Sequence, residues 1–253
     1  MILKFNTSLA ENYHSNSQKI RVMSEDWVGR FCFCTKCGSS FSKFKNNMPN
    51  RDFCCPECGS VFELKSKMGG FSRTIVDGSY FAMMENIRNG LAPNIMLLEY
   101  GKFFEVRNLI VIPKFYITEN IIIKRSPLRE YARRAGWIGC NIRYGEIPKS
   151  GKLFVVREGE FENKSQIIGS FNKMSFLGEI ACAKKKWLMD ILKCLEKLNM
   201  KNFSLNDIYS FENFLRERHP LNKNIKAKIR QQLQILRDVN YLKFAGSGNY
   251  EIL

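Results

Sequence analysis

The sequence predicts a mixed α/β fold, of the α+β kind, followed by a winged helix, and three observations predict it. Helix and strand patterns are mixed over roughly the first 180 residues, a length typical of one domain. Three amphipathic helices and a β-hairpin follow, which is the element order of a winged helix. Six of the nine cysteines lie within residues 32–58, which indicates a metal site inside the first domain. We therefore expect domains at residues 1–182 and 183–253.

The hydrophobic pattern of the first domain predicts its elements in order. Residues 16–30 form an amphipathic helix, and residues 71–88 contain a second helical stretch. Alternating or continuous apolar runs predict four strands, at residues 60–66, 95–100, 104–112 and 153–157.

The second domain shows an apolar helical stripe three times and then two short strands. A Gly-rich turn separates these strands, as in a β-hairpin. In chain order the elements are a helix over residues 187–198, a helix over residues 204–215 that Ser204 caps, a helix over residues 222–238, and strands at residues 241–244 and 250–253.

The composition limits the kind of partner. Of the 253 residues, 45% are hydrophobic and 13% aromatic, so the chain can bury a core and is not disordered throughout. The net charge of +16 favours a polyanion such as double-stranded DNA, whose phosphates attract a basic surface. No apolar run reaches the roughly 18 residues of a membrane span, and the first residues lack the apolar core of a signal peptide. We expect a cytoplasmic monomer that binds no membrane.

Two Cys-x-x-Cys pairs predict a structural zinc site. Residues 38–54 separate Cys34 and Cys37 from Cys55 and Cys58, a spacing within the range of about 15–20 residues for four-thiolate sites. One tight turn can aim both sulfurs of a pair at one Zn²⁺ ion, and two pairs complete a closed tetrahedron. A glycine follows each pair, where such a turn often needs a positive φ. The alternative is that these cysteines are buried as small hydrophobic residues.

Two basic segments are candidates for DNA binding. The third helix of a winged helix is usually its reading helix, and here its polar face is basic and glutamine-rich. The segment of residues 124–143 carries arginines around a tryptophan flanked by glycines, a group suited to stack on a base. The alternatives are a merely soluble helix and a core tryptophan. The candidate DNA-binding residues are Lys226, Arg230, Gln231 and Gln234 on the helix and Arg133, Arg134 and Trp137 in the segment.

Two acids and a lysine near the second cysteine pair predict a catalytic site. On a strand, Glu63 and Lys65 point to the same face. If the chain folds back at the cysteine pair as a hairpin, a two-residue slip from the simplest register places Asp52 opposite Glu63. The spacing is that of a PD-(D/E)xK nuclease motif, with Arg51 in the place of the proline. The alternative is an acid-x-Lys sequence on a solvated strand.

These residue types fit metal-dependent hydrolysis of a phosphodiester. Asp52 and Glu63 supply carboxylate oxygens, the ligands that Mg²⁺ prefers. The ion polarises the phosphoryl group and activates water, and Lys65 orients that water or stabilises developing charge. Glu25, on the first helix, is a further candidate near the metal. The chain has two histidines, so catalysis that depends on histidine is poorly supplied.

Several stretches of the chain resemble the DpnI-type restriction endonucleases, which cut adenine-methylated DNA. Together they extend over nearly the whole chain, although residues 88–125 and 158–185 are much less similar. The longest are ARRAGWIGCNI at residues 132–142 and IRQQLQILRD at residues 229–238, and shorter ones lie at residues 15–19, 25–28 and 62–67.

The resemblance implies a PD-(D/E)xK endonuclease domain with an embedded four-cysteine zinc site, joined to a winged helix. It implies a type II restriction endonuclease that uses Mg²⁺ to cleave double-stranded DNA at GATC containing N6-methyladenine. Asp52, Glu63 and Lys65 fall on the family's catalytic positions, and the four cysteines fall on its zinc positions. The family reads DNA with both domains, and Trp137 and residues 224–237 lie in the matching segments.

Two alternatives stay beside this interpretation. A DNA-binding regulator built from a zinc ribbon and a winged helix, without catalysis, would share the charge, the cysteines and the reading helix. A nuclease for RNA or branched DNA would share the catalytic residues as well, since one fold hosts many activities.

Overall fold

A computed structural model describes residues 2–44 and 51–253 of the chain. It divides into two compact units, Met1–Gly178 and Glu179–Leu253, and each unit has its own buried apolar core. Within the described residues, no helix combines the length and the apolar character needed to cross a membrane.

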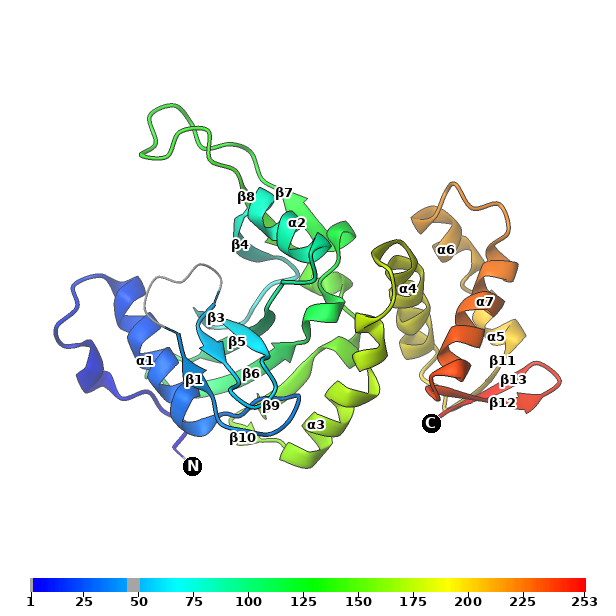
Figure 1. Cartoon of the computed structure of the whole chain (residues 1–253), viewed down its shortest axis with the longest axis horizontal. Helices are drawn as coiled ribbons and strands as arrows, with labels where there is room; N and C mark the ends of the chain where they lie inside the picture. Colours follow the sequence, from blue (N-terminus) through cyan, green and yellow to red (C-terminus); the bar gives the residue numbers. More distant parts are fainter. Residues whose placement is uncertain (1, 45–50) are drawn as a thin grey trace. The chain divides into compact units, whose positions relative to one another are not determined.

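A seven-stranded mixed sheet forms the centre of the first unit (Figure 1). β3 and β5 are parallel, and the other neighbouring strands are antiparallel. β5 is buried along almost its whole length, which explains its continuously apolar sequence. In sheet order the strands are β1 (Ser42–Lys43), β2 (Phe53–Cys54), β3 (Val61–Met68), β5 (Asn94–Tyr100), β6 (Val106–Ile112), β9 (Leu153–Arg157) and β10 (Glu160–Phe161).

Helices pack on this sheet through their apolar stripes. α1 (Asn16–Phe31) packs against β3, with Met23 and Trp27 buried in the core. The indole N–H of Trp27 donates to the backbone oxygen of Ile2 at 2.8 Å, so the buried ring keeps its hydrogen bond. α3 (Lys164–Lys173) packs against β9.

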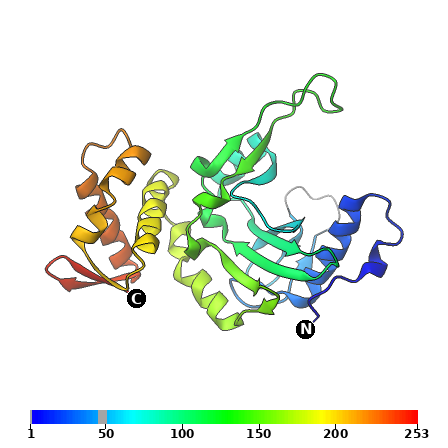
Figure 2. The ribbon, with the colours of Figure 1, turned by 180° about the vertical axis from the view of Figure 1, so that it is seen from behind.

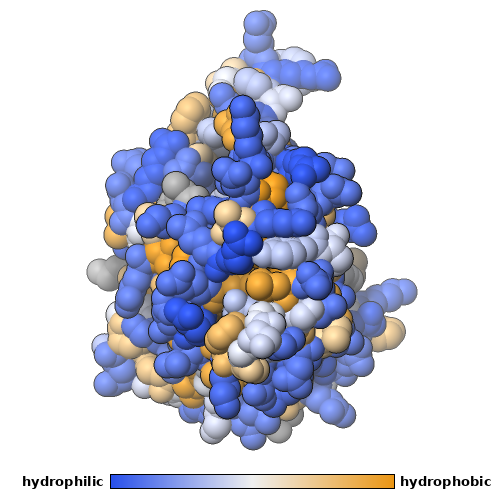
Figure 3. Space-filling view, turned by 90° about the vertical axis from the view of Figure 1, so that its right-hand side faces the viewer, coloured by the Kyte–Doolittle hydropathy of each residue, from blue (hydrophilic) through white to orange (hydrophobic). Residues whose placement is uncertain are grey.

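A second, three-stranded sheet carries a projecting hairpin. β4 (Ile75–Ser79) pairs with β8 (Gly139–Ile142), and β8 pairs with β7 (Ile122–Lys124). Residues 125–138 join β7 to β8 and extend away from both sheets, as the green loop in Figures 1 and 2 shows. The top of the molecule, where this loop lies, is mostly hydrophilic in Figure 3. α2 (Tyr80–Arg88) packs against all three strands, so the hairpin stands on a folded base.

The second unit is a winged helix, as the sequence predicts. Three helices and a small sheet follow the long helix α4, and the strand order of the sheet is β11-β13-β12. The elements are α4 (Cys182–Leu198), β11 (Asn202–Ser204), α5 (Leu205–Tyr209), α6 (Glu212–Arg218), α7 (Ile225–Asp238), β12 (Leu242–Gly246) and β13 (Asn249–Ile252).

The expected second helix of this unit is in fact two helices. The helix predicted over residues 204–215 breaks between α5 and α6, and the third helix begins at Ile225. The cap is confirmed, because the Ser204 hydroxyl accepts from the Asp207 N–H and the Asp207 carboxylate accepts from the Ser204 N–H at 2.7 Å. An amphipathic pattern continues through a break of two residues, which is why the sequence does not show it.

The first unit departs from the sequence prediction where its elements are short. The predicted helix over residues 16–30 and the four predicted strands are confirmed as α1, β3, β5, β6 and β9. The helical stretch expected within residues 71–88 is confirmed as α2, and the strand β4 before it is not predicted. The sequence does not predict β7, β8 or α3.

Leu97, a fully buried residue of β5, gives a test of the sheet core. Leu97→Ala is expected to lower the free energy of unfolding by about 2–5 kcal/mol, because it leaves a cavity in a central strand. Leu91→Ala, a control at a residue that is 55% exposed, is expected to change it by less than about 0.5 kcal/mol. Denaturant melts of both variants check this, and equal losses would contradict the described core.

Candidate active site

The two cysteine pairs form two turns of the same design. The Gly38 N–H donates to the oxygen of Cys34 at 2.7 Å, and the Gly59 N–H donates to the oxygen of Cys55 at 2.9 Å. Both glycines have positive φ, +83° and +67°, as the sequence predicts. Each turn therefore directs the two sulfurs of its pair to one side.

The four sulfurs lie within 4.8 Å of one another, which fits a zinc site. Cys34 and Cys58 are 3.5 Å apart, and Cys37 and Cys55 are 3.3 Å apart. Zinc–sulfur bonds of about 2.3 Å in a tetrahedron place the sulfurs roughly 3.8 Å apart, so a small outward shift admits the ion. In residues 2–44 and 51–253, this is the one group of three or more Cys, His, Asp or Glu placed to hold a metal.

The second cysteine turn also sets the register between β2 and β3. Phe53 pairs with Phe62, and the Asp52 N–H donates to the oxygen of Phe62 at 3.0 Å. Continuing this register by one residue brings Asp52 level with Glu63. This is the two-residue slip that the sequence allowed, and not the simplest register.

Glu63 and Lys65 lie on one face of β3 and meet Asp77 of β4. The Lys65 ammonium donates to Glu63 Oε1 and to Asp77 Oδ1, in both cases at 2.7 Å. The exposed fractions of these side chains are 11% for Glu63, 16% for Lys65 and 1% for Asp77. Burial acts to lower the pKa of Lys65, but the two carboxylates raise it above its usual value. The ammonium therefore stays charged.

Asp52 directly precedes β2 and lies beside β3. Its Oδ2 accepts a hydrogen bond from the Leu64 N–H at 2.6 Å. Asp52 lines a cavity of about 380 Å³ that Leu64 and Ser66 also line, and these two residues alternate with Glu63 and Lys65 along β3. Lys65 therefore bonds Glu63 directly. The Asp52 carboxylate instead bonds the backbone N–H of Leu64, which lies between these two residues.

Helix α1 adds a buried acid to the Asp52 cavity. Glu25 lines the cavity and pairs with Arg21 at 3.5 Å and with Lys43. Burial, with the negative charge of Glu25 as a smaller cause, raises the pKa of Asp52, although the hydrogen bond from Leu64 opposes this. Glu25, the further candidate near the metal, thus lies beside Asp52, and its metal role stays a prediction.

The carboxylates have unused capacity for a cation. Burial raises the pKa of Glu63, and Lys65 only partly offsets it. Glu63 Oε2 and Asp77 Oδ2 are buried and have no hydrogen-bond partner among the residues that the structure describes, an arrangement that costs free energy. Carboxylate oxygens are the ligands that Mg²⁺ prefers, so the donor set fits that ion. The residues expected to hold it are Asp52 and Glu63.

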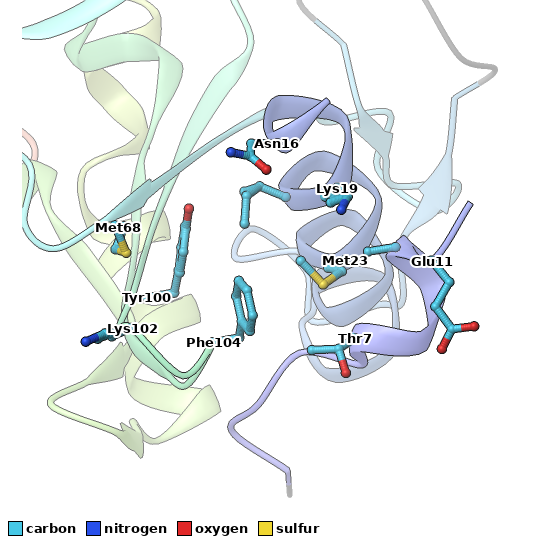
Figure 4. Close-up of a pocket in the computed structure, with 11 residues that line it drawn as sticks. Thr7, Glu11, Asn16, Lys19, Met23, Met68, Tyr100, Lys102 and Phe104 are labelled. Carbon is cyan, nitrogen blue, oxygen red and sulfur yellow. The ribbon is translucent and has the colours of Figure 1, made fainter. Parts of the chain in front are cut away.

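A larger and more apolar cavity, of about 520 Å³, adjoins the first one along α1. The rings of Tyr100 and Phe104 line it opposite Met23 of α1, as Figure 4 shows. It shares Asn16, Ile20 and Tyr100 with the Asp52 cavity. Asp52 and Glu25 line the smaller cavity and not this one, and Glu63 and Lys65 line neither of the two.

Comparison with known families supplies the decisive observation. Residues 1–180 match the Dam-replacing family, DpnI, and residues 183–252 match the Dam-replacing HTH domain. The chain belongs to the DpnI family. The resemblance found in the sequence is therefore confirmed, and with it a methyl-directed endonuclease fold that ends in a winged helix.

The DpnI family members act on DNA, and the reading helix predicted for this chain is α7. Lys226, Arg230, Gln231 and Gln234 are all exposed on it. Arg230 donates to the Tyr209 hydroxyl at 2.8 Å. The helix thus presents several cations and amides to solvent, as DNA contact requires.

The other predicted DNA contacts of this DpnI-family chain lie in the hairpin of residues 125–138. Arg133 and Arg134 are exposed, and the Arg134 guanidinium lies 4.8 Å from the centre of the Trp137 ring. Trp137 is half-buried and packs over Gly139, where an added Cβ would come within 2.9 Å of the ring. The tryptophan is held at the base of the hairpin and is not part of the main core.

Asp77 is the residue of this site that sequence reasoning missed. It lies in β4, a strand that the sequence does not predict, and it joins Lys65 only through tertiary structure. One signal was present: Ile75 and Asp77 alternate with the exposed Val76, so an acid stands at a core-facing position of a short strand.

Cys58→Ala is expected to remove the bound zinc, because three thiolates leave the tetrahedron open. Cys54→Ala is the control, since Cys54 adjoins the cluster but does not belong to it. Metal analysis of the purified proteins checks this, with about one zinc per chain expected for the wild type and for Cys54→Ala. Zinc retained by Cys58→Ala, or lost from Cys54→Ala, would contradict the assigned ligands.

Proposed function

We propose that this protein is a type II restriction endonuclease that cleaves double-stranded DNA at GATC containing N6-methyladenine and requires Mg²⁺. The observation that carries the proposal is the enclosed Glu63–Lys65 pair, with an unpartnered carboxylate oxygen, level with Asp52. Membership of the DpnI family supports methyl-directed cleavage. The resemblance to DpnI-type enzymes is the reason for choosing this DNA sequence and this methyl group.

The proposed chemistry is hydrolysis of one phosphodiester bond in each strand. Asp52 and Glu63 would hold Mg²⁺, which when bound would supply Lewis-acid chemistry at the scissile phosphoryl group. Lys65 donates a hydrogen bond where negative charge develops, and its two carboxylate partners hold the ammonium in place. The enclosed position keeps bulk water from weakening these interactions.

The two basic segments are proposed to bind the substrate. On α7, Lys226 and Arg230 neutralise phosphates while Gln231 and Gln234 reach base edges. In the hairpin, Arg133 and Arg134 contact the backbone and Trp137 contacts a base. Reading by two separate segments suits a single chain, so we propose that the enzyme acts as a monomer.

A digest of plasmid DNA tests the methyl-directed activity. In the presence of Mg²⁺, the protein is expected to cut adenine-methylated plasmid at GATC and to leave unmethylated plasmid intact. Fully methylated and hemimethylated duplexes then show whether both strands must carry the methyl group. Cutting of both plasmids equally would refute methyl direction, and cutting of RNA or branched DNA alone would favour another nuclease activity.

Glu63→Ala separates the endonuclease from a regulator that only binds DNA. The variant is expected to lose roughly 10³-fold in cleavage rate, because the metal loses a ligand and Lys65 loses a partner. Its affinity for methylated DNA is expected to stay within about threefold of wild type, since the reading segments are unchanged. Glu57→Ala, at an exposed acid of the second cysteine turn, is the control. Full cleavage by Glu63→Ala would show that Glu63 is not catalytic.

A further inference from the structure

Asp77 is the most deeply buried acid at the catalytic strand. Its side chain is 1% exposed, against 11% for Glu63. Its Oδ1 accepts from the Lys65 ammonium at 2.7 Å and from the Gly78 N–H at 2.6 Å, which fixes the rotation of the carboxylate. An ionised group is retained at such depth only when it is paired, and Lys65 is its one salt-bridge partner among the described residues.

Lys65 needs a second fixed partner if it is to serve catalysis. Its side chain has four rotatable carbon–carbon bonds, so one hydrogen bond to Glu63 leaves the ammonium free to swing. Glu63 is also the proposed ligand of Mg²⁺, and its carboxylate has to adjust when the ion binds. Asp77 comes from a different sheet and is not one of the two proposed Mg²⁺ ligands, so it can hold the ammonium from a second side.

The position of Asp77 connects the catalytic strand to the sheet that carries the hairpin. In β4, Asp77 pairs with Cys140 of β8, which begins directly after the hairpin of residues 125–138. The β4–β8 register shifts between Asp77 and Ser79, a bulge that re-aims a side chain locally. The Lys65–Asp77 salt bridge is therefore a direct link between β3 and the small sheet.

We propose that Asp77 is a positioning residue, which holds the Lys65 ammonium at the scissile phosphate by tying β3 to the sheet beneath the DNA-reading hairpin. This inference rests on the proposed nuclease function. Asp77 does not touch the substrate, and it acts through the position of Lys65.

Asp77→Asn tests the role with the full-length, zinc-loaded protein. The change keeps the shape of the side chain and removes its charge, so the single-turnover cleavage rate is expected to fall about 10²-fold, as for a catalytic group displaced by about 1 Å. Affinity for methylated DNA and the Mg²⁺ concentration for half-maximal rate are expected to stay within about twofold. Glu99→Gln is the matched control, since Glu99 is a half-buried acid of β5 that bonds Phe71 and Asn108 and does not contact Lys65.

Two further variants and one NMR measurement keep the result interpretable. If the buried amide of Asp77→Asn lowers stability, Asp77→Ser is used in its place. The cleavage rate is compared for the variant that keeps the wild-type melting temperature and zinc content. Asp77→Glu retains the charge and is expected to recover part of the rate that Asp77→Asn loses. Lysine side-chain nitrogen NMR is expected to show a protected Lys65 ammonium signal in the wild type that the neutral variants lose.

The outcomes separate this inference from the proposed function. Wild-type cleavage by Asp77→Asn, with Glu63→Ala inactive, would overturn the positioning role and leave the endonuclease intact. A rate loss that high Mg²⁺ restores would also overturn it, because Asp77 would then be a metal ligand. If Glu63→Ala cuts normally, the nuclease site itself is misassigned, whatever Asp77→Asn does.

Discussion

The register between β2 and β3 is the constraint on which the candidate site depends. The pairing of β3 with β5 holds Glu63 and Lys65, so a slip of one residue between β2 and β3 would move Asp52 away from its place level with Glu63. β2 is only two residues long, so its own hydrogen bonds hold this register weakly. The second cysteine turn closes the hairpin directly beyond β2, and a metal bound to four sulfurs would fix that turn. A zinc ion bound there would thus hold the geometry of the acids.

Without a bound cation, the buried charges of the site lower the stability of the folded protein. Burial raises the pKa of Asp52 and Glu63, which means that the folded protein disfavours their ionised forms. The Lys65 ammonium is shared by the carboxylates of Glu63 and Asp77. Among the described residues, Glu63 Oε2 and Asp77 Oδ2 have no hydrogen-bond partner. Buried charge of this kind is common at functional sites and rare elsewhere, because it lowers stability unless a ligand completes it. The arrangement therefore fits a site built for a divalent ion.

The sequence predicts the site where the residues are close along the chain, and it fails where they are not. Glu63 and Lys65 follow from strand alternation, and the cysteine spacing follows from the geometry of zinc. The place of Asp52 depended on a two-residue choice of register, which the hydrogen bonds around the turn decide. Asp77 depends on the packing of two sheets, for which no local pattern exists. For the same reason the short strands β7 and β8, which tertiary contacts stabilise, have no clear signal in the sequence.

The topology gives the hairpin of residues 125–138 an independence that the rest of the first unit lacks. β6 and β9 are antiparallel neighbours in the large sheet, yet the chain between them makes a long excursion through β7, the hairpin and β8. The tip of the hairpin makes no strand pairing with either sheet, and the cost of closing a loop grows only slowly with its length. Tips of different length and composition could therefore be grafted onto this base without altering the strand pairs beneath it.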